Sequence, residues 1–267
     1  MLLINAGSGP NGLALGRTSA EELAAEARAR GIEVRTIEAG EDVETVAQET
    51  EADVLGMAGG DGSLSVVAAA AIDRGVPFVC VPFGTRNHFA RDVGLDRDDP
   101  VAALDAFAGP ERRIDVGRVG ERIFLNNVSL GVYARLVHRR ERHRRRRDAL
   151  ARLRALAIVA RRPRPLRVTV DGKAVTARVV LVANNAYRLD LFNVGERDRL
   201  DDGLLHLYAP SGFMRRNWEE RTATRFVIDS RRRRLRAAVD GEPTLLETPL
   251  EFTIDPGALR LLVPPGT

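Results

Sequence analysis

Short apolar runs alternate with amphipathic stretches in the first half of the chain. The apolar runs predict four strands, at residues 2–5, 32–37, 54–57 and 76–81. Helical patterns fill the gaps between them. This alternation indicates a mostly parallel sheet covered on both faces, because parallel strands need crossover connections. Ligands of such sheets bind at the carboxyl ends of the strands.

The first predicted helix has clear start and stop signals. Thr18 and Ser19 both suit the N-cap position, and Glu21 and Glu22 stand where a capping box needs an acid. Gly31 marks the end of the helix.

The pattern changes after about residue 109, where short strand-like runs are separated by turns such as Asp171-Gly172. A series of this kind is typical of an antiparallel sandwich. One long helix, at residues 133–160, interrupts it. We therefore expect two domains, an α/β domain over residues 1–109 and a β-rich domain over residues 110–267. The expected strands of the second cover residues 113–119, 123–129, 166–170, 175–183, 204–208, 225–228, 237–240, 250–254 and 259–263.

Composition narrows the class of protein. The hydrophobic share of 44% and the charged share of 29% are those of a globular protein and exclude a disordered one. The single cysteine, Cys80, favours a reducing compartment, and the chain has no apolar run long enough to span a bilayer. We expect a cytoplasmic protein. Arginines crowd residues 139–147 and 231–234 although the net charge is only +4.

The first glycine-rich segment is Gly7-Ser8-Gly9-Pro10-Asn11-Gly12, directly after the first strand. It formally matches the dinucleotide fingerprint GxGxxG. In a Rossmann unit, however, the glycines open the helix, whereas here the helix caps come several residues later. The interpretations left open are a Rossmann loop, a flexible turn, and a phosphate-contacting loop of another kind, in which Ser8 and Gly9 take part.

A sharper signal is Ala58-Gly59-Gly60-Asp61-Gly62-Ser63, which stands between a strand and a helix. Glycines permit close backbone approach, and N–H groups at a helix start favour an anion. Asp61, expected in a surface loop at the sheet edge, is suited to orient a magnesium ion or its waters. The alternative is a tight turn in which Ser63 caps the helix.

The run Pro82-Phe83-Gly84-Thr85-Arg86-Asn87 follows the next strand and is expected at the same edge of the sheet. Thr85 is placed to donate its hydroxyl to a phosphate. Asn87 either holds the loop, contacts the nucleotide or caps a helix. We interpret His88 as a bystander on the solvent side.

Together, Gly-Gly-Asp-Gly-Ser at residues 59–63 and Pro-Phe-Gly-Thr-Arg-Asn at 82–87 resemble the paired nucleotide motifs of the bacterial diacylglycerol kinase catalytic-domain family. The resemblance continues through Asn-Asn-Val-Ser-Leu-Gly at 126–131, Asp-Asp-Gly-Leu-Leu at 201–205 and Asp-Gly-Glu-Pro at 240–243. It implies the NAD kinase/diacylglycerol kinase-like fold, which has an N-terminal Rossmann-like nucleotide domain and a β-rich antiparallel sandwich domain. It also implies a phosphotransferase with an alcohol acceptor, using ATP and Mg²⁺ to phosphorylate a lipid.

The resemblance also assigns roles to residues. It implies that Glu242 is the general base and that Asp61 acts beside it in catalysis. A second, structural metal would be held by the side chain of Asp202 and the main-chain oxygens of Arg199 and Leu204, although Asp202 also suits a plain Asp-Gly turn. The expected ATP-binding residues are Ser8, Gly9, Thr36, Gly59, Gly60, Asp61, Gly62, Ser63, Leu64, Ser65, Thr85 and Asn87.

The chain departs from the family pattern in two places. Members usually continue the glycine loop with Thr, then Asn and Glu, where this chain has Ser63, Ser65 and Val66. Losing the carboxylate at Val66 puts turnover or metal dependence in question. Residues 184–195 lack the glycine cluster common near the acceptor site, so the acceptor can differ from diacylglycerol.

Two rival functions stay open at this point. An NAD kinase shares Gly-Gly-Asp-Gly but is not expected to carry the 82–87 run, and a nucleotide-binding regulator without turnover is not expected to keep Glu242. We expect a lipid substrate and, through the basic helix at residues 133–160, peripheral contact with the anionic inner face of the membrane. The basic cluster has no interleaved aromatics, so no specific nucleic acid is expected. The oligomeric state is open, with a homodimer among the candidates.

Overall fold

The computed structural model describes residues 1–8, 18–131, 165–190, 193–194, 196–210 and 218–266. The chain divides into two compact units. Unit 1 comprises residues 1–116, 196–202 and 255–267, and unit 2 comprises residues 117–195 and 203–254. The sequence placed one boundary at residue 109, whereas the structure returns the C-terminal residues to unit 1. The reason is a strand pairing that the sequence does not show, in which Leu261 and Leu262 pair in parallel with Phe78 and Val79.

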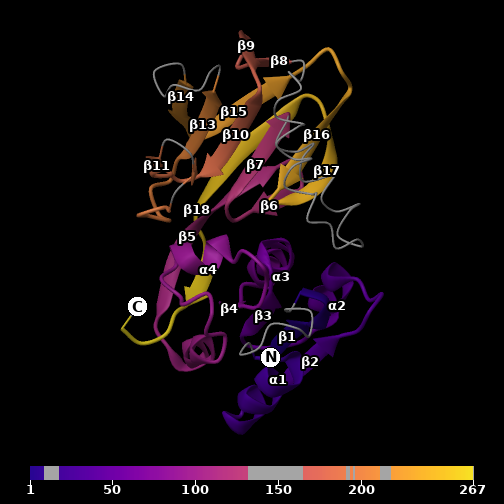
Figure 1. Cartoon of the computed structure of the whole chain (residues 1–267), viewed down its shortest axis with the longest axis vertical. Coiled ribbons are helices and arrows are strands. Elements are labelled where there is room, and N and C mark those ends of the chain that lie inside the picture. The colour runs from indigo at the N-terminus through magenta and orange to yellow at the C-terminus, as the bar shows by residue number, and fades with distance from the viewer. Residues whose placement is uncertain (9–17, 132–164, 191–192, 195, 211–217, 267) are drawn as a thin grey trace, which may run out of the picture. The chain divides into compact units, whose positions relative to one another are not determined.

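Unit 1 is built on a parallel sheet (Figure 1). Its strands follow the order β2-β1-β3-β4-β18, and each neighbouring pair is parallel. Helix α1 and a 3₁₀ helix at Ala102–Ala108 cover one face, while α2 and α3 lie together on the other. The predicted α/β sheet is therefore confirmed. Its elements are β1 (Leu2–Asn5), α1 (Ala20–Ala29), β2 (Val34–Ile37), α2 (Val43–Glu49), β3 (Leu55–Gly59), α3 (Asp61–Arg74), β4 (Phe78–Pro82), α4 (His88–Asp92), most of β5 (Glu111–Val119) and the end of β18 (Leu250–Leu262).

Local signals in the sequence set the helix ends of unit 1. Ser19 is the N-cap of α1, and the reciprocal hydrogen bonds of a capping box join it to Glu22, as predicted. Helix α3 ends at Gly75, whose φ of 65° lies in the left-handed region that favours glycine. Leu23 and Ala27 of α1 are fully buried against the sheet.

Unit 2 consists of antiparallel strands. A six-stranded sheet runs in the order β14-β13-β10-β7-β16-β17, while β8, β9 and β15 join β18 in the larger sheet. One hydrophobic core takes residues from both sheets, including Val128, Val182, Phe226 and Phe252, so the predicted sandwich is confirmed. The strands are β6 (Arg122–Phe124), β7 (Asn127–Gly131), β8 (Leu166–Val170), β9 (Lys173–Ala177), β10 (Val179–Asn184), β11 (Leu189–Asp190), β12 (Asn193–Val194), β13 (Leu205–Pro210), β14 (Trp218–Ala223), β15 (Arg225–Asp229), β16 (Arg234–Val239) and β17 (Glu242–Glu247).

Four details differ from the sequence expectations. The strand predicted at residues 123–129 is broken, because Leu125 and Asn126 donate their N–H groups to the carboxylate of Asp240. The strand predicted at residues 175–183 is two strands, β9 and β10, which are separated at Arg178. The two strands predicted at the C-terminus form one, β18, which passes Gly257 at a φ of 61°. Strands β11, β12, β14 and β17 were not predicted. The helix predicted at residues 133–160 lies outside the described residues.

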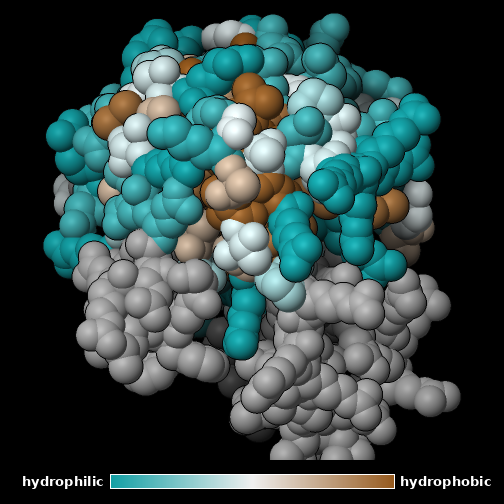
Figure 2. Space-filling model, turned by 90° about the horizontal axis from the view of Figure 1, so that it is seen from above, coloured by the Kyte–Doolittle hydropathy of each residue, from teal (hydrophilic) through white to brown (hydrophobic). Residues whose placement is uncertain are grey.

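The surface seen from above the view of Figure 1 is largely hydrophilic, with apolar side chains gathered near its middle (Figure 2). Leu245, at 56%, is the one large apolar side chain that is well exposed in the described part of the chain. No described helix is both long and apolar enough to cross a bilayer.

Candidate active site

The glycine loop at residues 59–63 joins the carboxyl end of β3 to the start of α3. Gly59 closes the strand, Gly60 is the N-cap of α3, and no side chain caps the helix there. A Cβ at Gly59 would come within 2.8 Å of Met57 Cε and 3.0 Å of Ser63 Cβ, so both side chains would have to shift to make room for it. The start of a 14-residue helix is thus left without a capping side chain, which suits it to bind an anion.

The second loop, at residues 83–87, lies directly against the first. A Cβ at Gly84 would stand 2.4 Å from Gly60 Cα and 3.0 Å from Gly60 N. Phe83 N also donates to Gly59 O at 3.2 Å. The two loops therefore meet backbone to backbone at one edge of the sheet, as the sequence predicted.

Asp61 joins the two loops. Its carboxylate accepts hydrogen bonds from the backbone N–H groups of His88 at 3.2 Å and Phe89 at 2.9 Å. The sequence predicted that Asp61 lies in a surface loop, and this prediction is wrong. Asp61 is only 9% exposed and lies buried in the first turn of α3. It caps α4 from another helix, and this positions the second loop relative to the first.

Asn87 holds the second loop from within. Its Oδ1 accepts from Gly84 N at 2.8 Å, and its Nδ2 donates to Gly84 O at 3.1 Å. The residue is buried and has a φ of 49°, a conformation that asparagine tolerates better than most residues. Of the roles left open by the sequence, holding the loop fits these contacts. Thr85 is exposed at the tip of the same loop.

Asn5 is a residue of this site that the sequence motifs do not include. Its Nδ2 donates to Ser63 Oγ at 3.2 Å, and its Oδ1 accepts from Gly7 N at 3.1 Å. Asn5 therefore orients the hydroxyl of the glycine loop from the carboxyl end of β1. The available signal was a polar residue that ends a buried strand and directly precedes glycine.

The remaining nucleotide candidates are spread over unit 1. Thr36 pairs with Ile4, one residue from the carboxyl end of β2. The side chain of Leu64 is fully buried, and Ser65 Oγ donates to Gly62 O at 3.0 Å. Ser8 ends a short 3₁₀ helix after β1. Gly9 lies outside the described residues.

His88 is not a solvent-side bystander, because its ring is half-buried beside Asp61. Burial lowers the pKa of His88 from its usual 6.5, nearby Asp61 opposes that shift, and the charges of Arg91 and Arg86 add to it. The imidazole is therefore neutral at pH 7 in the folded protein.

We expect the free energy of unfolding to fall as the pH drops below 6.5, because the unfolded chain then binds a proton that folded His88 resists. His88 stabilises the fold fully above that pH and loses the contribution as the pH falls through its lower folded pKa. Urea unfolding at about pH 7.5 and 5.5 measures the change. The pH dependence should be weaker in His88→Asn, and an equal dependence in both proteins would contradict this assignment.

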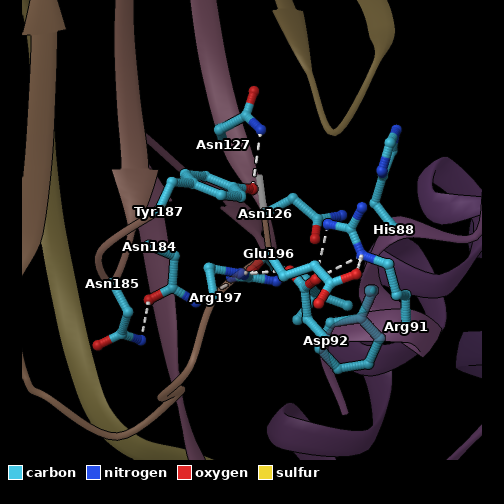
Figure 3. A network of polar contacts seen from close by, with 12 residues as sticks. His88, Arg91, Asp92, Asn126, Asn127, Asn184, Asn185, Tyr187, Glu196 and Arg197 are labelled. Atoms are coloured by element: carbon cyan, nitrogen blue, oxygen red, sulfur yellow. Dashed lines mark hydrogen bonds and ion pairs between the residues drawn. The ribbon is translucent and has the colours of Figure 1, made fainter. Parts of the chain in front are cut away.

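A group of charged side chains surrounds the end of α4 (Figure 3). Arg197 Nε lies 2.7 Å from Asp92 Oδ2, and neither side chain has any exposed surface. Arg91 binds the other oxygen of the same carboxylate, with Nε and Nη2 at 3.1 and 2.9 Å from Oδ1. Arg197 could not be singled out from the sequence, because the run of charges at residues 196–202 resembles a solvated loop.

Glu242, the candidate base, is described with unit 2. It is exposed and is the first residue of β17, directly after the turn Asp240-Gly241 that joins β16 to β17. Both turn residues have positive φ, 46° and 86°, as expected for a two-residue hairpin turn. The carboxylate of Asp240 accepts from three backbone N–H groups, those of Leu125 at 2.8 Å, Asn126 at 2.8 Å and Asn127 at 3.1 Å. Asp240 thus fixes the turn that presents Glu242.

Further polar groups of unit 2 lie near the start of β7 (Figure 3). Asn127 Nδ2 donates to Tyr187 Oη at 3.1 Å, and Tyr187 N donates to Tyr208 Oη at 3.2 Å. Asn184 Nδ2 donates to Leu125 O at 3.1 Å. Residues 184–187, at the start of the stretch that lacks the glycine cluster, are therefore held by buried amides and tyrosines.

The metal-binding set implied by the resemblance, the Asp202 side chain with the main-chain oxygens of Arg199 and Leu204, stays a prediction. Arg199 Nε stands 3.1 Å from Asp202 Oδ1 and 3.1 Å from Asp201 Oδ1, so a guanidinium already pairs with both carboxylates. Leu204 comes just before β13. Within the described ranges, no group of three or more His, Cys, Asp or Glu side chains is arranged to hold a metal ion.

The fold and these loops define a class. An α/β unit with two glycine loops at adjacent strand ends, followed by an antiparallel sandwich, is the NAD kinase/diacylglycerol kinase-like architecture. A crystal structure of a diacylglycerol kinase from Bacillus anthracis superposes with a TM-score of 0.69 at 17% identity, covering 99% of this chain and 96% of that one. A second structure from the same organism gives 0.73 at 19%, covering 100% and 97%. These likenesses show the fold.

Sequence comparison gives partial matches to lipid kinases. Residues 1–119 of this chain are similar to the diacylglycerol kinase catalytic domain. A YegS-like lipid kinase of Pseudomonas fluorescens is 44% identical over 75 residues, which cover 27% of this chain and 25% of the relative. Diacylglycerol kinases of Bacillus subtilis and Mycobacterium tuberculosis are 35% and 32% identical over 91 and 130 residues, covering 33% and 45% of this chain and 30% and 41% of the relatives. Each match spans less than half of the relative's length.

Proposed function

We propose that this protein transfers the γ-phosphoryl group of Mg–ATP to a hydroxyl group of diacylglycerol or a related lipid. The observation that carries the proposal is the backbone contact between Gly60 and Gly84 at the uncapped start of α3. This arrangement offers backbone N–H groups and the positive end of a helix dipole to a polyphosphate. Catalysis of phosphoryl transfer rests mainly on such positioning and charge neutralisation.

Named residues supply the parts of the phosphate site. Ser63 Oγ, oriented by Asn5, and Thr85 Oγ1, at the exposed loop tip, are the hydroxyl donors. Asp61 and Asn87 hold the two loops in register. Mg²⁺ enters with ATP as part of the substrate.

Glu242 is the proposed general base. Its carboxylate takes the proton of the lipid hydroxyl while that oxygen bonds to the γ-phosphorus and the bond to the ADP oxygen breaks. The products are the phosphorylated lipid and ADP. An exposed carboxylate on a fixed turn suits this task, since the base must meet a substrate that comes and goes.

A transfer screen tests the function. Purified protein is incubated with γ-labelled ATP, Mg²⁺ and, separately, diacylglycerols, sphingoid bases, polyprenols and NAD. Label should appear in one lipid class. Label in NAD would identify an NAD kinase. ATP binding without transfer to any acceptor would favour a regulator that has lost turnover, as the missing acid at Val66 allows.

Contact with an anionic membrane surface is a second part of the proposal. It rests on the arginine-rich sequence at residues 139–147, which lies outside the described residues. Each engaged arginine adds about 1 kcal/mol of attraction to an acidic surface, and salt screens that attraction.

We expect salt-sensitive sedimentation with vesicles that contain anionic lipid, and loss of that binding when Arg144 to Arg147 are changed to Ser. Replacing Arg231 to Arg234, the other arginine run, provides the matched control. Equal sedimentation of the parent protein and the 144–147 variant at low salt would contradict the assignment.

A further inference from the structure

Residues 196–202 form a segment that belongs to unit 1 although its neighbours in the chain belong to unit 2. It follows β12 and leads into β13, which lies between β14 and β10 in the six-stranded sheet. The family resemblance assigns this segment a metal site, and the candidate side chain, Asp202, pairs with Arg199 in this structure. Its strongest contacts serve another purpose.

The first anchor of the segment is the buried ion pair of Arg197 with Asp92. Arg197 Nε and Asp92 Oδ2 are 2.7 Å apart, and both side chains are fully buried. Arg91 donates a hydrogen bond to the other carboxylate oxygen of Asp92. Glu196 Oε1 stands 3.6 Å from Arg91 Nε, so acidic and basic groups alternate through the cluster. A buried charge is tolerated only when it is paired, and removing one partner leaves the other uncompensated.

The second anchor lies three residues further along. Leu200 is 4% exposed, and its carbonyl accepts from Asp115 N at 2.7 Å. The carboxylate of Asp115 in turn accepts from Gly257 N at 2.9 Å, which ties β5 to β18. The segment is therefore fixed at one point to β5 and at another to α4.

Helix α4 depends on these contacts for its position. It has only five residues, too few to be stable without support from elsewhere. Asp61 holds its first two N–H groups, and Arg197 holds Asp92, its last residue. The loop at residues 83–87 runs directly into this helix, so its placement against Gly60 follows that of α4.

We propose that Arg197 is a positioning residue of the nucleotide site, which holds Asp92 at the end of α4 and so sets where the second glycine loop stands against Gly60. The proposal rests on the proposed function, because it names what sets the geometry of that phosphate site. Energetic coupling of this kind is reciprocal, so nucleotide bound at the loops also restrains the segment.

The test compares Arg197→Gln with Arg260→Gln in the full chain. Arg260 is the matched control because it also ties two distant parts of unit 1, through ion pairs with Glu111. Amide exchange at His88 and Phe89 should rise by about 10-fold or more in Arg197→Gln, while the amides of α1 and α2 keep their rates. The Mg–ATP concentration for half-saturation should rise by about 10-fold, with kcat changing less. Arg260→Gln should leave all these values near those of the parent.

Each outcome decides the matter. Faster exchange spread evenly over α1, α2 and α4 would show that Arg197 only adds to global stability, and unchanged exchange at His88 and Phe89 would also overturn the proposal. If Arg197→Gln does not fold, Arg197→Lys replaces it, because it keeps the charge. In Arg197→Lys the amide exchange of His88 and Phe89 should also rise, by a smaller factor, while the amides of α1 and α2 keep their rates. If the exchange pattern holds while the parent binds no ATP, the positioning role stands and the proposed kinase function fails.

Discussion

Asp61→Ala is expected to abolish phosphoryl transfer and also to lower the stability of the protein. The substitution leaves the backbone N–H groups of His88 and Phe89 without their acceptor in a buried site. An unsatisfied buried donor costs about 1–3 kcal/mol, so the free energy of unfolding should fall by about 2 kcal/mol. The second loop then shifts relative to Gly60, and displacements of about 1 Å are enough to reduce turnover about 100-fold. Urea unfolding and a transfer assay measure the two effects.

Asp42→Ala provides the control for this experiment. Asp42 also caps a helix of unit 1, accepting from Thr45 N at 3.0 Å at the start of α2. Its loss should cost about 1 kcal/mol of stability and leave turnover unchanged. If Asp61→Ala kept near-normal turnover, the nucleotide site would have to lie elsewhere. If it lost turnover without any loss of stability, Asp61 would act on the substrate and not on α4.

The fold could be predicted because its signals are local. The capping box at Ser19 and Glu22, the alternation of strands and helices, and the turn at Asp171-Gly172 each depend on residues close together in the chain. The errors arose where distant groups intervene. The carboxylate of Asp240 accepts a hydrogen bond from Leu125 N and so interrupts the strand predicted at residues 123–129. The carboxylate of Asp115 accepts from Gly257 N, within the single strand β18.

The candidate site divides in the same way. The glycine loops could be located because a strand, a glycine run and a helix follow one another directly in the sequence. Their glycines include Gly59, Gly60 and Gly84. Asp61 caps α4 by binding His88 and Phe89, which lie 27 and 28 positions further along the chain. Arg197 and Asp92 are 105 positions apart. Charge and spacing in the sequence do not reveal such partners, because an exposed acid and a buried cap have the same local pattern.

A change of the proposed base, Glu242, should lower the rate of phosphoryl transfer. The residue follows a turn that Asp240 fixes through three backbone N–H groups, so a change of its side chain should leave the hairpin in place. Glu247, at the other end of β17, provides the matched control. It is also exposed, and its carboxylate pairs with Arg234 at 2.7 Å.

Glu242→Gln should keep the affinity for Mg–ATP and lose about 100-fold or more of the transfer rate, because the amide cannot take the proton of the lipid hydroxyl. Glu247→Gln should keep both the affinity and the rate. Nucleotide affinity from equilibrium binding and the rate at saturating lipid separate the two effects. A fall in ATP affinity in step with the rate would make Glu242 a ligand of the nucleotide or its metal. A rate close to that of the parent would show that the lipid hydroxyl loses its proton to another group.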